Sequence, residues 1–167
     1  MFKKLFGLGS KAQKEETIVA PLTGEVKNIE EVPDPVFAQR MMGDGIAIVP
    51  TEGIVVSPVD GEIVQVFHTK HAVGIKSKNG LEILIHVGLE TVSLNGEGFE
   101  AHVASGQEVK AGDKLLTFDL AFIGEKAKSI ITPMVITNGD AFGAIDKNID
   151  TQAQKGQTTV MTVTLGK

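Results

Sequence analysis

A chain of 167 residues with 42% hydrophobic residues is long enough to bury the core of one domain, which excludes a wholly disordered protein. Because the chain has no Cys, disulfides, thiol nucleophiles and thiolate metal sites are excluded, and any chemistry falls to histidines, hydroxyls and carboxylates. The net charge of −5 and the lack of a basic patch interleaved with aromatic residues argue against nucleic acid as a partner. No apolar run is long enough to span a bilayer and no signal-peptide core is present, so we expect a cytoplasmic protein.

The first 16 residues differ in composition from the rest of the chain. Apolar residues at positions 2, 5, 6 and 8 alternate with lysines, a pattern that suits a short helix at a membrane surface. Gly7 and Gly9 weaken such a helix, which favours a solvated tail. We therefore predict a flexible or amphipathic tail over residues 1–16, with weak membrane contact through residues 2–8 as its alternative role, and a single folded domain over residues 17–167.

From Thr17 onward, short Val/Ile-rich runs alternate with Gly, Pro and Asp, which predicts an all-β fold: an antiparallel β-sandwich or barrel, similar to a barrel-sandwich hybrid. The expected strands are Thr17–Ala20, Gly24–Ile29, Gly45–Val49, Ile54–Ser57, Gly61–Phe67, Ala72–Ser77, Leu81–Gly88, Phe99–Val103, Lys114–Asp119, Ile131–Ile136 and Thr158–Leu165. Two short helical turns are expected, at Val36–Met41 after the capping pair Asp34-Pro35, and at Leu120–Lys128.

An internal repeat accompanies this pattern. The segment IVAPLTGEV at Ile18–Val26 recurs as VVSPVDGEI at Val55–Ile63. Proline ends ladder pairing and glycine permits a reversal, so each copy predicts a sharp corner between two strands.

The candidate site lies in a predicted β-hairpin at residues 69–92. Asn79 and Gly80 predict a two-residue type I′ turn, which would set Val73 opposite His86. In that register one face carries two imidazoles that can meet on a diagonal, with the hydroxyl of Thr69 in line. The residues expected on this face are Thr69, His71, Val73, Ile75, Leu84 and His86. A lone strand histidine is usually structural, but two imidazoles and a hydroxyl converging on one face indicate a functional site.

Two kinds of chemistry suit this pair. In the first, a neutral ring nitrogen of His86 attacks a phosphoryl group while His71 and Thr69 orient the transferring oxygens. In the second, both histidines bind zinc, with a third ligand from a carboxylate such as Asp34 or Glu90 or from a partner. The zinc interpretation is weaker because the sequence assigns no third ligand.

At this point the residues resemble a known family, the glucose-type enzyme IIA component of the bacterial phosphoenolpyruvate-dependent sugar phosphotransferase system. The similarity covers almost the whole chain, in order. The segments that carry it are IVAPLTGEV (Ile18–Val26), VPDPVFA (Val32–Ala38), GDGIAI (Gly43–Ile48), PVDGEI (Pro58–Ile63), FHTKHAVGI (Phe67–Ile75), LIHVGLETV (Leu84–Val92), LNGEGF (Leu94–Phe99), GDKLLTFDL (Gly112–Leu120) and TPMVITN (Thr132–Asn138).

The resemblance implies a phosphotransferase component that works through a phosphohistidine and requires no cofactor. His86 matches the histidine that is phosphorylated on Nε2 by the phosphocarrier HPr and that then passes the group to a cysteine of a IIB sugar-permease domain. His71 matches the supporting histidine, with Thr69 beside it. Some relatives bind zinc through both histidines when a partner supplies a carboxylate. Phosphorylation-dependent docking on transporters or kinases is a further expected role.

An apolar patch around the histidines would receive HPr and the IIB domain in turn. The expected patch residues are Phe37, Met41, Met42, Phe67, Leu84 and Val92, with Asp34 and Glu90 at the rim. The alternative is that the apolar residues belong to the core and the carboxylates are ordinary solvated groups. His68 and His102 are interpreted as structural or surface histidines. A lipoyl- or biotin-type carrier domain is the competing class, but Lys78, at its expected turn, lacks flanking methionines.

Overall fold

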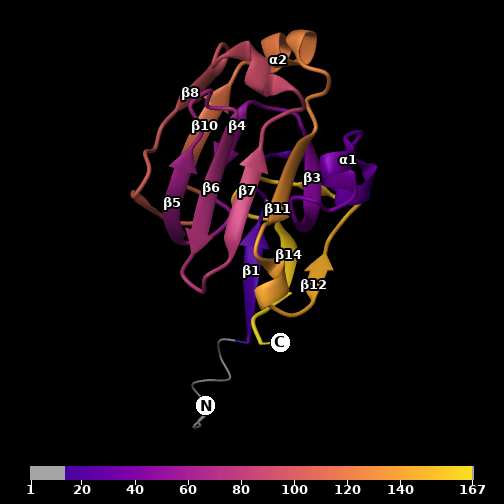
Figure 1. The fold of residues 1–167 in the computed structure, drawn as a ribbon, viewed down its shortest axis with the longest axis vertical. Coiled ribbons are helices and arrows are strands. Elements are labelled where there is room, and N and C mark those ends of the chain that lie inside the picture. Colours follow the sequence, from indigo (N-terminus) through magenta and orange to yellow (C-terminus); the bar gives the residue numbers. More distant parts are fainter. Residues whose placement is uncertain (1–13, 167) are drawn as a thin grey trace.

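The computed structural model describes residues 14–166, which form three antiparallel sheets with few helical turns (Figure 1). The strands are β1 (Glu15–Val19), β2 (Gly24–Asn28), β3 (Asp44–Pro50), β4 (Ile54–Val56), β5 (Gly61–Val66), β6 (Ala72–Ser77), β7 (Glu82–His86), β8 (Phe99–Ala101), β9 (Glu108–Val109), β10 (Lys114–Phe118), β11 (Thr132–Ile136), β12 (Ile145–Lys147), β13 (Gln152–Ala153) and β14 (Thr159–Thr164). The helical elements are η3 (Ile29–Glu31), α1 (Pro35–Ala38), η4 (Thr91–Leu94), α2 (Leu120–Lys126) and η5 (Gly139–Ala141). The expected all-β fold is confirmed.

The sheets are arranged around one large central sheet. Its strand order is β13-β2-β3-β11-β7-β6-β5-β9, and the two smaller sheets have the orders β1-β14-β12 and β4-β10-β8. In Figure 1 the small sheet β4-β10-β8 and α2 lie toward the top of the molecule, and the small sheet β1-β14-β12 lies toward the bottom. Strands β7 and β11 are neighbours at the centre of the large sheet.

The strand predictions hold apart from their ends and three short strands. Strand β1 begins at Glu15 rather than Thr17, so the folded domain starts before the expected boundary. The rest of the expected tail, including residues 2–8, lies outside the described residues. Strands β9, β12 and β13 were not expected, because two or three residues are too few to show an alternating apolar pattern.

The internal repeat corresponds to two equivalent halves of the fold. Counted inward from the two edges of the large sheet, the strands correspond: β2 and β3 on one side occupy the places that β5 and β6 occupy on the other. The two proline corners interlock through reciprocal hydrogen bonds: Val19 N donates to Pro58 O (3.0 Å) and Val56 N donates to Pro21 O (2.8 Å). The repeated prolines therefore do more than turn the chain, because their carbonyls join the halves.

The large sheet separates two apolar clusters. Its inner face contributes Val73, Ile75, Ile83 and Ile85 to the main core, together with residues of the small sheets. Its outer face contributes Ala72 and Leu84 to a second cluster, which α1 and η3 cover with Phe37 and Ile29. This second cluster supports the candidate site.

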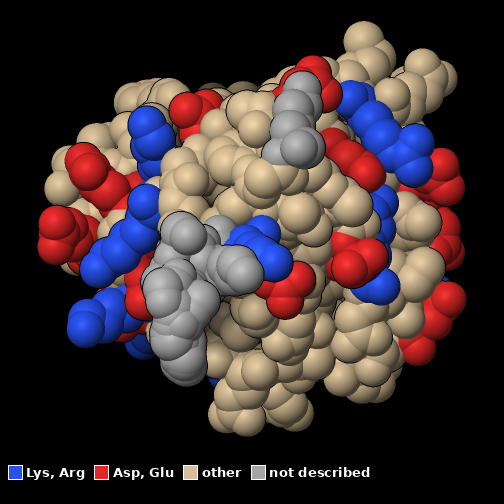
Figure 2. Space-filling view, turned by 90° about the horizontal axis from the view of Figure 1, so that it is seen from below, with Lys and Arg blue, Asp and Glu red and all other residues tan. Residues whose placement is uncertain are grey.

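Both expected helical turns are present, and the first is capped as predicted. Asp34 caps α1 by accepting from Val36 N (3.0 Å), with Pro35 as the first helical residue, and Asp119 caps α2 by accepting from Phe122 N (3.0 Å). Within residues 14–166, no helix has the length and apolar character needed to cross a membrane. Figure 2 shows the molecule from below, where Lys/Arg and Asp/Glu side chains are interspersed with uncharged surface.

Candidate functional site

The turn of the β6–β7 hairpin differs from the predicted type I′ loop. Gly80 is left-handed (φ +95°), but Asn79 is not among the non-glycine residues with positive φ. Gly80 N donates to Ser77 O (2.9 Å) and Ser77 N donates to Leu81 O (2.8 Å), so the loop has three residues, 78–80. Such a loop needs only one left-handed residue. Ser77 favours it further, because its Oγ accepts from Leu81 N (3.0 Å).

The extra loop residue shifts the register by one position. Ala72 lies opposite His86 and Gly74 opposite Leu84, instead of Val73 opposite His86. The predicted placement of Val73 and Ile75 on the histidine face is therefore wrong, since both point into the main core and are at most 1% exposed. A shift of one residue moves every side chain of a strand to the other face.

His71 nevertheless reaches His86, because it lies in a bend before β6 and not in the ladder. Lys70 is left-handed (φ +59°), and Lys70 N donates to Phe67 O (2.7 Å), which closes the bend. Val87 N donates to His71 O (2.7 Å) and ties the bend to the end of β7. The two imidazole rings meet edge to face with centroids 4.8 Å apart, so the expected proximity of the pair is confirmed although its predicted cause was not.

The two imidazoles form the middle of a row of four rings. Phe37 of α1 packs against His86 with centroids 5.2 Å apart, and Phe67 packs against His71 at 5.6 Å. His71 is 5% exposed and His86 is half-buried. The row holds both imidazoles in fixed orientations within an apolar setting.

Hydrogen bonds to the Nδ1 atoms define which nitrogens are available. The Nδ1–H of His86 donates to the carbonyl of Gly88 (2.8 Å); because a carbonyl only accepts, the proton lies on Nδ1 and Nε2 keeps a free lone pair. The Nδ1 of His71 is paired with the Thr69 hydroxyl. Thr69, His71 and His86 thus form one connected group, as expected.

Both histidines are held neutral. Burial, and next the neighbouring His86, lower the pKa of His71 to about 4. Burial also lowers the pKa of His86, against the opposing effects of the Gly88 carbonyl and the carboxylate of Asp34. At neutral pH the site therefore presents two uncharged imidazoles, one with an unprotonated Nε2.

Comparison with known proteins assigns the family. The family model described as "phosphoenolpyruvate-dependent sugar phosphotransferase system, EIIA 1" matches residues 16–142. The chain belongs to this family. It is 75% identical over 165 residues to a protein of Bacillus cereus named "PTS system glucose-specific EIIA component", covering 99% of both chains. A Staphylococcus aureus protein of the same name is 56% identical over 165 residues, again with 99% of both chains covered.

A solved structure supports the assignment of the EIIA fold. The "glucose permease IIA from Mycoplasma capricolum" superposes with a TM-score of 0.80 at 42% identity, covering 90% of this chain and 97% of that one. The resemblance seen in the sequence is therefore confirmed at the level of family and fold, and a lipoyl- or biotin-type carrier is not the class to which this EIIA chain belongs.

The expected patch residues of this EIIA chain divide into exposed and buried groups. Met41, Met42 and Val92 are 69%, 40% and 54% exposed, as docking requires. Phe37 and Leu84 are only 5% and 8% exposed and belong to the second apolar cluster, so their placement on the exposed surface was wrong. Phe67 is half-buried against the same cluster. Burial follows from α1 folding over the outer face of the sheet, which the hydrophobic pattern alone does not reveal.

Two further exposed apolar residues extend this surface without having been predicted. Val36 is 39% exposed on α1, and Val64 is 56% exposed at the β5 bulge. Val64 borders a groove of about 270 Å³ whose other walls include Met42, Phe67, Gly74 and Leu84. The groove shares Phe67 with the ring row, so an apolar surface runs from the histidines across β6 and β7.

The expected rim carboxylates have separate structural positions. Asp34 is the N-cap of α1 and lies close enough to His86 to oppose the lowering of its pKa. Glu90 is exposed and left-handed (φ +60°) at the start of η4. His68 is exposed, and His102 is exposed with its Nε2 paired to the Thr117 hydroxyl (2.9 Å), which confirms both as surface histidines.

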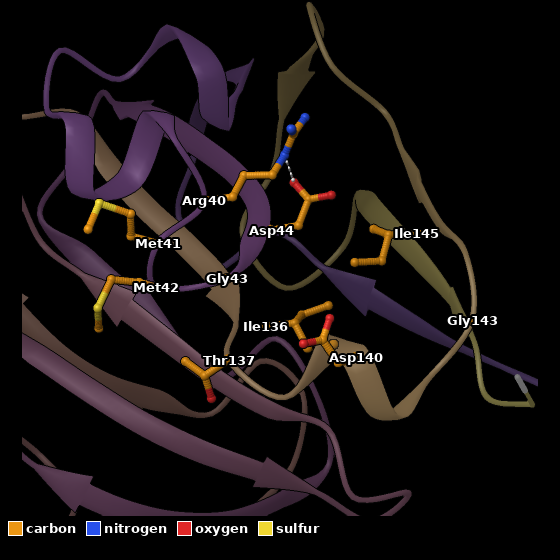
Figure 3. A pocket seen from close by; sticks show the side chains of 11 residues that line it. Arg40, Met41, Met42, Gly43, Asp44, Ile136, Thr137, Asp140, Gly143 and Ile145 are labelled. Atoms are coloured by element: carbon orange, nitrogen blue, oxygen red, sulfur yellow. Dashed lines mark hydrogen bonds and ion pairs between the residues drawn. The ribbon is translucent and has the colours of Figure 1, made fainter.

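A larger cavity of about 410 Å³ lies away from the two histidines (Figure 3). In Figure 3, Met41 and Met42 lie at one margin and Asp44 and Ile145 at the other. Gly24 pairs with Pro50 in one half of the repeated fold, and Gly61 pairs with Ser77 in the other. Asp44 precedes Pro50 by as many residues as His71 precedes Ser77, so Asp44 is the counterpart of His71.

The counterpart position holds an ion cluster instead of an imidazole. One oxygen of Asp44 accepts from Arg40 (3.0 Å), Lys147 (2.6 Å) and Gly45 N (2.8 Å). These donors lower the pKa of Asp44 despite its partial burial. The fold repeats this position, and only the copy at His71 carries an imidazole.

The histidine pair also meets part of the requirement for zinc. The Nδ1 atoms of His71 and His86 each have a hydrogen-bond partner. Neither Nε2 atom takes part in a hydrogen bond within residues 14–166, so both are free to serve as zinc ligands once unprotonated. In that range no group of three or more His, Asp, Glu or Cys side chains is placed to hold a metal ion. The pair fits zinc as two ligands of four and needs the rest from elsewhere.

Proposed function

We propose that this EIIA chain is a phosphocarrier that accepts a phosphoryl group from phospho-HPr on Nε2 of His86 and passes it to a cysteine of a IIB sugar-permease domain. The observation that carries this proposal is the bond from His86 Nδ1–H to Gly88 O, which leaves Nε2 as the nucleophilic nitrogen. Membership of the EIIA family supports the role of a phosphotransferase component.

In the accepting step, the Nε2 lone pair attacks phosphorus while the bond from phosphorus to the donor atom of HPr breaks. No proton needs to leave His86, since Nε2 carries none and Nδ1–H stays bonded to Gly88 O. The ring becomes a phosphoimidazolium, whose positive charge the Gly88 carbonyl stabilises. In the donating step a IIB thiolate attacks phosphorus and the P–Nε2 bond breaks, which restores the neutral ring.

His71 orients the phosphoryl oxygens. With the Thr69 hydroxyl donating to its Nδ1, His71 carries its proton on Nε2 and offers an N–H to a phosphoryl oxygen. Its lowered pKa keeps the ring neutral, so it binds the oxygen without holding the phosphate as tightly as a cation would. This balance suits a carrier that must release its group.

The apolar surroundings determine where partners bind. The exposed apolar residues Val36, Met41, Met42, Val64 and Val92 provide a surface on which HPr and the IIB domain dock in turn. Closing this surface excludes water that would hydrolyse the phosphohistidine. Asp34 and Glu90 at the rim pair with basic partner residues and steer docking. Since two relatives are named glucose-specific, glucose is the proposed sugar of the partner permease.

The test is phosphorylation with radiolabelled phosphoenolpyruvate, enzyme I and HPr. We expect an acid-labile, base-stable label on the wild-type protein and none on His86→Ala. The matched control is His102→Ala, which removes an exposed histidine elsewhere and should keep the label. Label on His86→Ala at the wild-type level would end the assignment.

The role of His71 has its own test. His71→Gln should still accept the phosphoryl group, because the nucleophile is intact, but should transfer it to the IIB domain more slowly. Single-turnover transfer to the IIB domain from phosphorylated protein measures this directly. Normal sugar phosphorylation by His71→Gln would contradict the role given to His71.

Zinc binding and regulatory docking remain further proposals for the same surface. Zinc would be held by Nε2 of His71 and of His86 with a carboxylate from a docked partner, and would join the two proteins without taking part in transfer. For this, the ring proton of His71 would move to Nδ1, where the Thr69 hydroxyl would accept it. Calorimetry with zinc should show tight binding only in the presence of such a partner. Docking on transporters or kinases should differ between phosphorylated and unphosphorylated protein in pull-down experiments, because the phosphate occupies the centre of the surface.

A further inference from the structure

The peptide unit between Val87 and Gly88 is held at both ends by buried threonine hydroxyls. Its carbonyl, Val87 O, accepts from Thr91 Oγ1 at 2.6 Å. Its amide, Gly88 N–H, donates to Thr132 Oγ1 at 3.4 Å, while that hydroxyl donates to Ile130 O at 3.0 Å. Thr91 is 0% and Thr132 is 1% exposed, so water does not replace these bonds.

The next peptide unit is held as well. Leu89 N–H donates to Ser129 O at 2.9 Å, and Gly88 O accepts from Nδ1–H of His86. All four polar groups of the two peptides around Gly88 therefore have defined partners, and the direction of the Gly88 carbonyl is fixed on both sides.

Gly88 is the residue that this geometry requires. It is left-handed (φ +71°), and a Cβ at this position would lie 2.8 Å from Thr91 Cγ2 and 3.0 Å from Ser129 O. The left-handed conformation turns the chain so that the carbonyl faces back toward the side chain two residues earlier. Thr91 packs at the place where a side chain on Gly88 would stand.

We propose that Thr91 and Thr132 are positioning residues that hold the Gly88 carbonyl against His86 and so keep the ring proton on Nδ1 and the nucleophilic Nε2 bare. The kinetic consequence depends on the proposed function, whereas the effect on the ring proton does not. Neither threonine touches the reacting atoms; both act through the loop that follows β7.

The direct test is ¹⁵N NMR of the His86 ring in the unphosphorylated protein. Wild-type His86 should show a single Nδ1–H tautomer. In Thr91→Val and in Thr132→Val, which keep the shape but lose the hydroxyl, a buried peptide group loses its partner and the Gly88 carbonyl is freed. A second population with the proton on Nε2 should then appear, and the rate of phosphoryl acceptance should fall about three- to tenfold, the effect of one hydrogen bond.

Controls separate positioning from stability. Thr91→Ser and Thr132→Ser keep the hydroxyl and should restore both the tautomer and the rate. Ile18 lies on β1 and belongs to the main core. Ile18→Val lowers stability without touching the loop and should leave the His86 tautomer unchanged. If a valine variant does not fold, the cysteine variant, a poor hydrogen-bonding substitute of similar size, is measured instead.

The outcomes are distinguishable. A single Nδ1–H tautomer in both hydroxyl-free variants overturns the positioning role. A mixed tautomer with an unchanged acceptance rate supports the positioning role but contradicts His86 Nε2 as the nucleophile, and so contradicts the proposed function instead.

Discussion

His71 meets His86 edge to face, with ring centroids 4.8 Å apart and ring planes at 77°. Each ring is anchored through Nδ1, one by Gly88 O and the other by Thr69. The contact places two neutral imidazoles where a phosphoryl group on one can be bound by the other. Burial of this pair affects the stability of the fold, its dependence on pH and the rate of phosphoryl transfer.

The first prediction concerns acid stability. The pKa of folded His71 is lowered to about 4 from 6.5, so the unfolded chain binds more protons than the folded chain between these values. This stabilising effect is complete above pH 6.5 and is lost as pH falls toward 4. His71→Gln should therefore lose less stability than wild type between pH 6.5 and 4 in urea titrations, with His102→Gln as the control. Equal losses in wild type and His71→Gln would contradict the assigned direction.

The second prediction concerns the hydroxyl on His71. In the proposed function the Thr69 hydroxyl donates to His71 Nδ1, so Thr69→Val removes this donor and transfer to the IIB domain should slow about three- to tenfold. Thr69→Ser keeps the hydroxyl and should transfer at close to the wild-type rate. Rapid-quench transfer from the phosphorylated variants measures both rates, and equal rates for the valine and serine variants would exclude this role.

The third prediction concerns the groove beside the histidines. Gly74 lies mid-strand, is not left-handed, and an added Cβ would meet nothing within 4 Å. A glycine there costs about 0.5–1 kcal/mol relative to alanine, with no packing reason within the described residues. Gly74→Val should therefore keep or raise the melting temperature while filling the groove and weakening HPr binding at least about fivefold.

The graded variant Gly74→Ala serves as the control for that experiment. One methyl group should raise stability and reduce HPr binding less than valine does. Calorimetric titration with HPr and thermal melts of both variants provide the measurements. Wild-type affinity in Gly74→Val would show that no partner side chain enters the groove.

The fourth prediction concerns Glu16, which joins β1 to the β6–β7 turn. It accepts from Ser77 Oγ (2.8 Å) and Asn79 Nδ2 (3.3 Å), and burial raises its pKa above 4.5. The folded state therefore holds a proton that the unfolded state releases, so this stability is present below pH 4.5 and is lost as pH rises through the folded pKa.

Glu16→Gln removes the charge and keeps the acceptor oxygen. Its stability relative to wild type should rise as pH increases from 4.5 to 7, as measured by urea unfolding at each pH. Glu15→Gln, at the exposed neighbouring position of the same strand, should show no such trend. A pH-independent difference for Glu16→Gln would contradict the raised pKa.

The sequence alone was sufficient for the all-β class, the positions of the longer strands, the cap of α1 and the identity of the histidine pair. These features are local: a strand follows from alternating Val and Ile, a corner from Pro and Gly, and a helix start from Asp34-Pro35. The matched family segments are also linear in the chain, so they needed no coordinates.

Only the tertiary structure determined the hairpin register, the burial of Phe37 and Leu84, and the threonines that hold Gly88. The register depended on whether the loop has two or three residues, a choice that Ser77 settles through bonds to Leu81 and Glu16. Thr132 bonds to Gly88 from a different strand, 44 positions along the chain. Contacts between distant segments leave no periodic pattern in the sequence, and a one-residue slip exchanges the two faces of a strand. For this reason the pair of histidines could be predicted, while the geometry that orients them could not.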